Sequence, residues 1–328
     1  MSLDHYVSQV YLKNFRSPEL GRLYAIRKSD LKEFTPDTKS VCRIEEGSTN
    51  PYLQEPRIVE EFLRDIEPKY NAALEKLATD SVDPECVYVI AGFVAYVLTC
   101  SPAGMRIQSK MPASMIEEIG RKLEREGSIP PPPPVLGGKS FTELIEKEKI
   151  FIKVDPKYPQ AIGITNLLSV INTFGNSKWD ILVNTFGDSP FFTSDFPVAI
   201  EKADDPRIFN RIIPLAPELA LRIRPDITVD RENMDSFFAG LRYTIRKLDR
   251  NTVAYINRLI VRCAEKTVFF RNNYQWIPRF VKKNANFRIE PRTHRIPSGD
   301  GTLLFTTMEI CEPVRRNKQN ENAHTRSR

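Results

Sequence analysis

The sequence lacks the short motifs by which several enzyme classes are recognised. It contains no GxGxxG, Walker loop, GxSxG or HExxH, so the usual signatures of dinucleotide binding, P-loop hydrolysis, serine hydrolysis and zinc proteolysis are absent. Histidine occurs 3 times in 328 residues, and the 5 cysteines are scattered without a CxxC pair. This spacing excludes an evident zinc cluster and a disulfide-rich scaffold. We therefore predict reduced, mostly buried cysteines in a cytoplasmic protein.

Long apolar runs are also missing. The most apolar stretch, 86–99 (CVYVIAGFVAYVLT), is shorter than the roughly 20 residues that cross a bilayer, so it predicts a buried helix and no membrane partner. The first fifteen residues have no basic region followed by an apolar one, so we expect no secretory leader.

The hydrophobic pattern predicts a mainly α fold with a small β-sheet, an α+β class in which a helical bundle is joined to short antiparallel strands. We predict a single globular domain over 1–312, followed by a disordered basic tail over 313–328, which has almost no apolar residues. Within the domain, an N-terminal arm covers 1–56, a helical part 56–170, and a β-containing and C-terminal helical part 171–312.

Local signals refine this division. Two β-rich runs over 179–200 flank Gly187-Asp188 and predict a hairpin or two adjacent strands. Residues 231–267 predict helices with a break near 249–252. The proline run Pro130–Pro134 predicts a stiff polyproline II loop; a protein partner of the SH3 kind is the less favoured interpretation, because such ligands usually add a flanking arginine.

Several motifs follow one another in a distinctive order. They are His5-Tyr6-Val7 with Tyr11-Leu12 and Phe15, an acidic helix around Glu60 and Glu67, Cys100-Ser101-Pro102 with Arg106, Thr193-Ser194-Asp195-Phe196-Pro197-Val198, Pro214-Leu215-Ala216-Pro217, and Asn257. In this order they resemble the family grouped as domain of unknown function 4238, over nearly the whole chain to about residue 270. Ser8 stands where that family usually has proline, and Cys100 where arginine is common. The resemblance implies an architecture, and no chemistry.

Four polar residues of these motifs are candidates for a site. His5 is either a hydrogen-bonded structural residue or a catalyst. Asp195 ends a strand-like run, where it serves either a site or an Asx turn before Pro197. Glu67 lies next to the apolar stripe of its predicted helix. Asn257 is an oxygen ligand or, the favoured interpretation, the cap of a buried helix end.

If His5, Glu67 and Asp195 converge, they offer one imidazole and two carboxylates, which suit a divalent metal such as Mg²⁺ or Mn²⁺ that hydrolyses a phosphodiester. The leading hypothesis is therefore a metal-dependent nuclease or phosphodiesterase, with a microbial defence or toxin role as one context. In it, Asp195 and Glu67 bind the metal, and His5 is a ligand or general base.

The charge distribution supports a polyanionic partner. The formal net charge is +6, but residues 242–295 alone hold fourteen Lys and Arg against three acidic residues. Arg258, Arg262 and Lys266 are successive i+4 neighbours, and with Arg271 they predict a nucleic-acid-binding ridge among aromatic residues that would stack on unpaired bases. The alternatives are a solvated helix face and, for the whole chain, a non-catalytic nucleic-acid-binding or regulatory protein whose motif residues only hold the fold.

Overall fold

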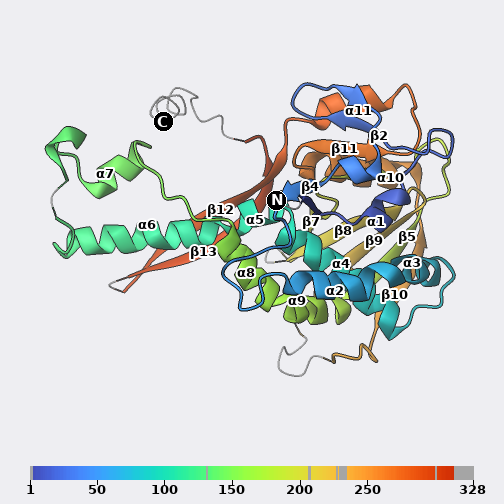
Figure 1. Ribbon diagram of the computed structural model, residues 1–328, viewed down its shortest axis with the longest axis horizontal. Helices are drawn as coiled ribbons and strands as arrows, with labels where there is room; N and C mark the ends of the chain where they lie inside the picture. The colour runs from blue at the N-terminus through green and yellow to red at the C-terminus, as the bar shows by residue number, and fades with distance from the viewer. Residues whose placement is uncertain are drawn as a thin grey trace.

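A five-stranded sheet lies at the centre of the protein's main body (Figure 1). In the computed structural model, which describes residues 3–130, 132–205, 208–226, 228, 235–299 and 301–313, the strand order is β10-β5-β9-β8-β7. The strands are β5 (Lys178–Val183), β7 (Ala199–Lys202), β8 (Phe209–Ala216), β9 (Leu219–Arg224) and β10 (Arg242–Lys247). β10 runs parallel to β5, and the other neighbours are antiparallel.

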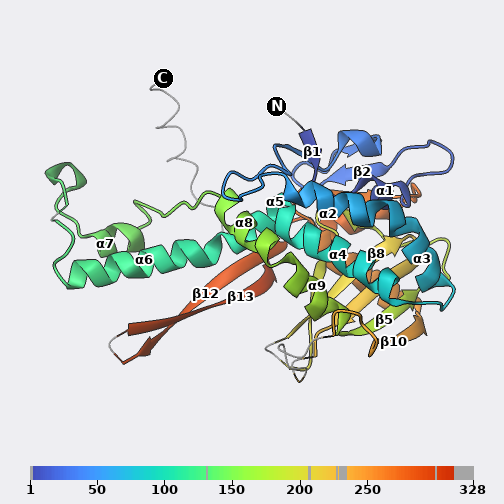
Figure 2. The same ribbon diagram turned by 60° about the horizontal axis from the view of Figure 1, so that its bottom comes forward.

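Helices cover one face of this sheet, as Figure 2 shows. They are α2 (Ile58–Ile66), α3 (Tyr70–Ala78), α4 (Pro84–Cys100) and α9 (Leu167–Gly175), with the short 3-10 helix η2 (Glu67–Lys69) between α2 and α3. The indole of Trp179 on β5 donates to the carbonyl of Phe174 on α9 at 2.8 Å, which fixes that helix against the sheet.

α4 is buried on nearly all sides, as the apolar run 86–99 predicts. Asp83 caps its first turn by accepting the amide of Cys86 at 2.8 Å, and Pro84 occupies the first helical position. Across the described residues, only the sharply bent pair of α4 with the segment 102–125 has the length and apolar content of a membrane span, and no single helix does.

Two smaller sheets complete the body. The N-terminal arm contributes β1 (Leu3–His5), α1 (Gln9–Lys13), β2 (Tyr24–Arg27), β3 (Glu33–Phe34), η1 (Thr38–Ser40) and β4 (Arg43–Glu45). β1 pairs with β4, and β2 pairs with β3 as an antiparallel hairpin. β2 continues through β11 (Thr267–Phe270) to β6 (Thr193–Ser194), so this sheet joins segments more than 160 residues apart.

An arm projects from the body (Figure 1). The helices that lead to the arm or lie in it are α5 (Pro102–Gln108), α6 (Lys110–Arg125), η3 (Pro134–Leu136), α7 (Phe141–Glu146) and α8 (Lys157–Thr165). Two further helices, α10 (Arg250–Cys263) and α11 (Ile277–Asn284), lie in the body. In the arm, α6 lies along the hairpin of β12 (Arg288–Ser298) and β13 (Gly301–Cys311), and a hydrogen bond of 2.9 Å joins Ser114 to Thr293. Ser140 and Glu143 form the capping box that opens α7.

The α+β class is confirmed, whereas a helical bundle is not, because the helices are distributed over the sheets and the arm. Two local predictions are wrong. β5 pairs with neither β6 nor β7, so 179–200 is not a hairpin. Residues 242–247 form the strand β10 and not a helix. The four-residue spacing of Arg242 and Arg246 fits both structures, because residues four apart also lie on one face of a strand. Pro131 and the tail from 314 lie outside the described residues.

Candidate functional site

One buried hydroxyl joins three of the motifs. The phenol of Tyr11 donates to the carbonyl of Pro214 at 2.7 Å and shares a short hydrogen bond with the hydroxyl of Thr193. Its ring stacks on Phe93 of α4, with ring centroids 4.6 Å apart. Burial raises the pKa of Tyr11 far above its ordinary value, so the group stays neutral. Tyr11 is therefore a cross-link of the core.

Asn257 has a comparable role on α10. Its amide oxygen accepts the backbone N–H of Phe192 at 2.9 Å, and its amide nitrogen donates to the carbonyl of Pro190 at 2.9 Å. The side chain is buried, and both of its ends are engaged by the segment that leads into β6. Rather than capping a helix end, Asn257 holds the Thr-Ser-Asp segment against α10.

The carboxylate of Asp195 is directed into the protein. It accepts the backbone N–H groups of Glu265 and Lys266 at 3.0 and 2.8 Å, while its own N–H donates to the carbonyl of Thr267 at 3.0 Å. The residue is 5% exposed. Burial, the first cause, and the neighbouring charge of Glu265 raise the pKa of Asp195 to about 6. The hydroxyl of Ser194 accepts the N–H of Phe196, which completes a local turn.

Lys28 holds the same segment from the other side. Its ammonium donates to the carbonyls of Ala264 and Phe287, the latter at 2.7 Å, and the residue is 8% exposed. Burial lowers the pKa of Lys28 to about 8, and the charge of Asp195 opposes that shift. We call residues 264–266, which follow α10, the anchored loop, because the carboxylate and the ammonium both bind its backbone.

Arg106 adds a third anchor. Its guanidinium makes a bidentate pair with Glu265, at 2.9 and 2.8 Å, and also donates to Glu290 at 3.3 Å and to the carbonyl of Ile289 at 2.8 Å. Bidentate charge-assisted bonds of this kind fix geometry strongly. The motif residues Arg106 and Asp195 thus meet at the anchored loop, and each contacts it from a different element.

His5 lies elsewhere, on β1 opposite Arg43 of β4. Its carbonyl accepts the hydroxyl of Tyr96 at 2.6 Å, and its ring atom Nε2 is buried without a hydrogen-bond partner. Burial, followed by the charge of Arg43, lowers the pKa of His5 below 6.5, so the ring is neutral at pH 7.

Glu67 begins η2 and is half-buried. Burial raises the pKa of Tyr96, and the negative charge of Glu67 raises it further. Within the part of the chain that the structure describes, no group of three His, Cys, Asp or Glu side chains is placed to hold a metal ion. The proposed ligands His5, Glu67 and Asp195 therefore do not form one centre there.

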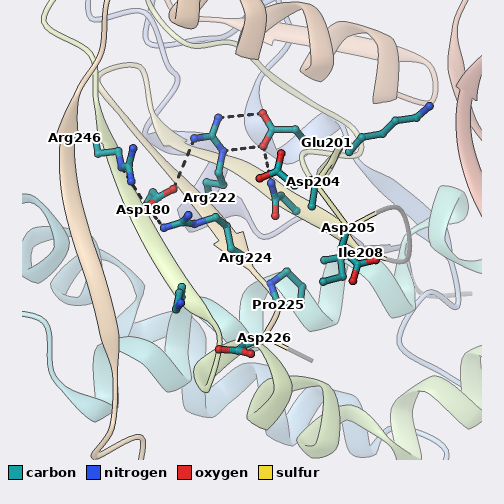
Figure 3. Close-up of a pocket in the computed structure, with 14 residues that line it drawn as sticks. Asp180, Glu201, Asp204, Asp205, Ile208, Arg222, Arg224, Pro225, Asp226 and Arg246 are labelled. Carbon is teal, nitrogen blue, oxygen red and sulfur yellow. Dashed lines mark hydrogen bonds and ion pairs between the residues drawn. The ribbon is translucent and has the colours of Figure 1, made fainter. Parts of the chain in front are cut away.

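An open cavity of about 530 Å³, which we call the basin, lies on the sheet face that α10 borders. Figure 3 shows Arg222 between two carboxylates, with its Nε 2.9 Å from Glu201 and its Nη1 3.7 Å from Asp180. Arg224 and Arg246 approach the same Asp180 at 2.9 and 3.3 Å. Five basic and five acidic side chains line this basin, so its charges compensate one another.

Sequence reasoning missed the basin. The signal was the alternation Arg222-Ile223-Arg224, which places two charges on one face of a buried strand. Such charges are rarely buried unless they are paired, so they predict acidic neighbours. The basin continues to α10, because Glu201 accepts a hydrogen bond from Tyr255.

The fourteen cations of 242–295 fall into two groups. Seven are ion-paired: Arg242, Arg246, Arg250, Arg271, Arg288, Arg292 and Arg295. Lys247 and six residues on or beside α10 and α11 have no ion pair with the residues described in the structure. We call these six the α10–α11 basic surface: Arg258, Arg262, Lys266, Arg279, Lys282 and Lys283. Arg271 is excluded because Glu218 neutralises it.

The aromatic residues of this region contact protein. Phe269 and Phe270 are buried in β11. Trp276 stacks on Phe192 with centroids 5.5 Å apart, its indole N–H donates to the carbonyl of Asp188, and it is 36% exposed. Phe269 and Phe270 therefore belong to the core, and Trp276 lies at its edge.

Together these contacts define an α+β protein whose motif residues stabilise the junction between the N-terminal arm, β6 and the anchored loop. The chain belongs to the family described as protein of unknown function (DUF4238), which matches residues 4–273 and confirms the resemblance. No curated protein matches the chain. No solved structure matches it either.

Proposed function

We propose that this protein binds nucleic acid through the phosphate backbone and does not cut it, using the α10–α11 basic surface. The observation that carries the proposal is the set of six cations without acidic partners among the described residues. A cluster of like charges without partners destabilises a fold slightly, and a polyanion would relieve that repulsion. Such contacts position a nucleic acid without reading its sequence.

The two helices present these side chains together. On α11, Ile277 and Val281 are buried, so Arg279, Lys282 and Lys283 lie on the opposite, exposed face. α10 is joined to this helix by Arg262, whose Nε donates to the amide oxygen of Asn284 at 2.9 Å. The guanidinium of Arg262 also lies 4.4 Å from the ring centre of Phe287.

Arg258 extends the surface one turn along α10. It is exposed and shares a helix face with Arg262 because the two are four residues apart. Towards the basin, Tyr255 and Glu201 follow on the same side. The basin's own cations are neutralised, so the phosphate-binding part ends near Arg258.

The interior placement of the motif residues supports binding rather than cleavage. The carboxylate of Asp195 is not exposed to solvent, and both of its oxygens already accept backbone N–H groups. Metal-dependent nuclease activity with Mg²⁺ or Mn²⁺ remains a prediction. Incubation of the purified protein with labelled DNA or RNA and each ion tests it. Metal-dependent cleavage that Asp195→Ala abolishes, with folding intact, would overturn the non-catalytic proposal.

Fluorescence anisotropy with a labelled 20-base-pair DNA duplex and the matching single strand tests the surface. Each phosphate contact contributes about 0.9 to the slope of log K against log salt on a duplex. The triple variant R258Q/K266Q/K283Q should bind more weakly on every sequence and lose about 2 to 3 from that slope.

The control is K13Q/K39Q/K149Q, which removes the same charge from exposed lysines outside the surface. It should bind as the unmodified protein does. Equal losses in both variants would show that net charge alone governs binding, and unchanged affinity in R258Q/K266Q/K283Q would remove this surface from the proposal.

A further inference from the structure

A second cavity, of about 380 Å³, lies on the helix-covered face of the central sheet. Its walls come from the end of α4, from α5, α8 and α9, and from the base of the β12–β13 hairpin. Most of the lining is apolar: Leu98, Ile107, Val170, Phe174, Phe196 and Met308. Ile162 and Asn166, which are exposed, mark its mouth on α8. A volume near the lower end of the range for small-molecule sites indicates a small ligand.

Arg211 of β8 is the one charged residue that lines this cavity. Its strand neighbour Asn210 faces the basin on the opposite side of the sheet, where it binds Glu201 at 2.9 Å. Because side chains alternate along a strand, Arg211 faces the helices and the cavity.

The guanidinium of Arg211 has no polar partner in the part of the chain that the structure describes. Among the described residues it makes no ion pair and no hydrogen bond, in contrast to Arg222 on the adjacent strand, which binds two carboxylates. Burial lowers the pKa of Arg211 to about 10, and the nearby Cys263 thiol opposes that change. Arg211 is half-buried, with its charge against the cavity. A partly desolvated cation without a partner is unfavourable, and a ligand that supplies the opposite charge removes that cost.

We infer that this cavity binds a small organic monocarboxylate, with its carboxylate on Arg211 and its apolar body against α4, α5 and α9. A single guanidinium matches a single carboxylate in charge and offers the two parallel N–H donors that bind it bidentately. Phe196 and Phe174 would contact the apolar body, which explains why so few polar groups line the cavity. The amide nitrogens of Gln108 and Asn166 donate to the carbonyls of Leu98 and Ile162 at 2.8 and 2.7 Å, so the charge-assisted bonds to the carboxylate would come from Arg211.

Calorimetric titration of the full chain with octanoate tests the inference, and octan-1-ol is the neutral probe of the same chain length. Octanoate should bind and raise the melting temperature, whereas octan-1-ol should bind at least about tenfold more weakly, since hydrogen bonds to a charged group contribute about 1.5–3 kcal/mol. Equal affinity for the two probes would overturn the role of Arg211, and no binding of octanoate at millimolar concentration would overturn the proposed ligand class.

Two variants locate the site. Arg211→Gln should weaken octanoate binding by about tenfold to a hundredfold and leave octan-1-ol binding unchanged. Val170→Trp should block both probes by filling the cavity. Octanoate that binds V170W or R211Q as tightly as the unmodified protein occupies some other place, and the inference then fails.

A measurement without ligand separates binding from structure. Arg211→Met should keep or raise the melting temperature, because it removes a half-buried charge that no residue of the described chain pairs. A large fall in melting temperature would mean that Arg211 holds the fold, which would also overturn the inference. Neither Arg211 variant should alter DNA anisotropy, because the α10–α11 basic surface lies outside the cavity, so the two proposals fail independently.

Discussion

Replacement of Asp195 by alanine tests whether the most distinctive motif is structural. The carboxylate accepts two backbone N–H groups of the anchored loop and lies near the buried ammonium of Lys28. The substitution leaves both N–H groups without their acceptor and removes the charge that favours the Lys28 ammonium. Each lost bond to a charged group costs about 1–3 kcal/mol, so we expect Asp195→Ala to lower the free energy of unfolding by about 2–5 kcal/mol at pH 7.

The pH dependence of this effect has a definite sign. The pKa of Asp195 is raised in the folded state from 3.8 to about 6, so its contribution to stability is fully present below pH 3.8 and is lost as the pH rises through 6. With these two values, the unmodified protein gains about 1.3 kcal/mol relative to Asp195→Ala when the pH falls from 7 to 5. The cost of the substitution should therefore be larger at pH 5.

Urea unfolding at pH 5 and pH 7, followed by tryptophan fluorescence, measures both quantities; Trp179 is buried and Trp276 partly exposed. Asp188→Ala is the matched control, because Asp188 is exposed and pairs with Arg250 at the surface. That substitution should change stability by less than about 0.5 kcal/mol, with no difference between the two pH values. An Asp195→Ala protein as stable as the control would refute the structural role of Asp195 and reopen a catalytic one.

Two further substitutions test the packing around the motifs. Tyr11→Phe should lower the free energy of unfolding by about 1–3 kcal/mol, because Thr193 and the carbonyl of Pro214 lose a buried partner; Tyr52→Phe, at an exposed hydroxyl bound to Asp155, should change it by less than about 0.5 kcal/mol in the same urea titration. Gly104→Ala should destabilise by more than about 2 kcal/mol, because its Cβ would lie 2.0 Å from the carbonyl oxygen of Leu98, whereas Gly187→Ala, with open space at that position, should be near neutral; equal melting temperatures for the two would contradict the close approach of α5 to α4.

The sequence by itself determined the elements whose signals are local. Asp83-Pro84 and the apolar run after it predict where α4 begins and that it is buried, since a cap and a hydrophobic circumference belong to the helix itself. The capping box at Ser140 was equally readable. The order of the motifs was enough to indicate the family, because that order is a property of the chain alone.

Tertiary structure decided the partners. Charge counts made 242–295 a uniform basic region, but only the fold pairs Arg271 with Glu218 and leaves Arg258 and Lys266 without an acidic partner among the described residues. Likewise, strand patterning could not show that β6 pairs with β11, because residues more than 70 positions apart carry no shared local signal. From the sequence, Asp195 could belong either to a functional site or to a turn. The structure shows that its carboxylate accepts two backbone N–H groups of the anchored loop. Arg211 was an ordinary residue of a β-rich run. Only the packing of helices against its face of the sheet half-buried its charge and placed it in a cavity.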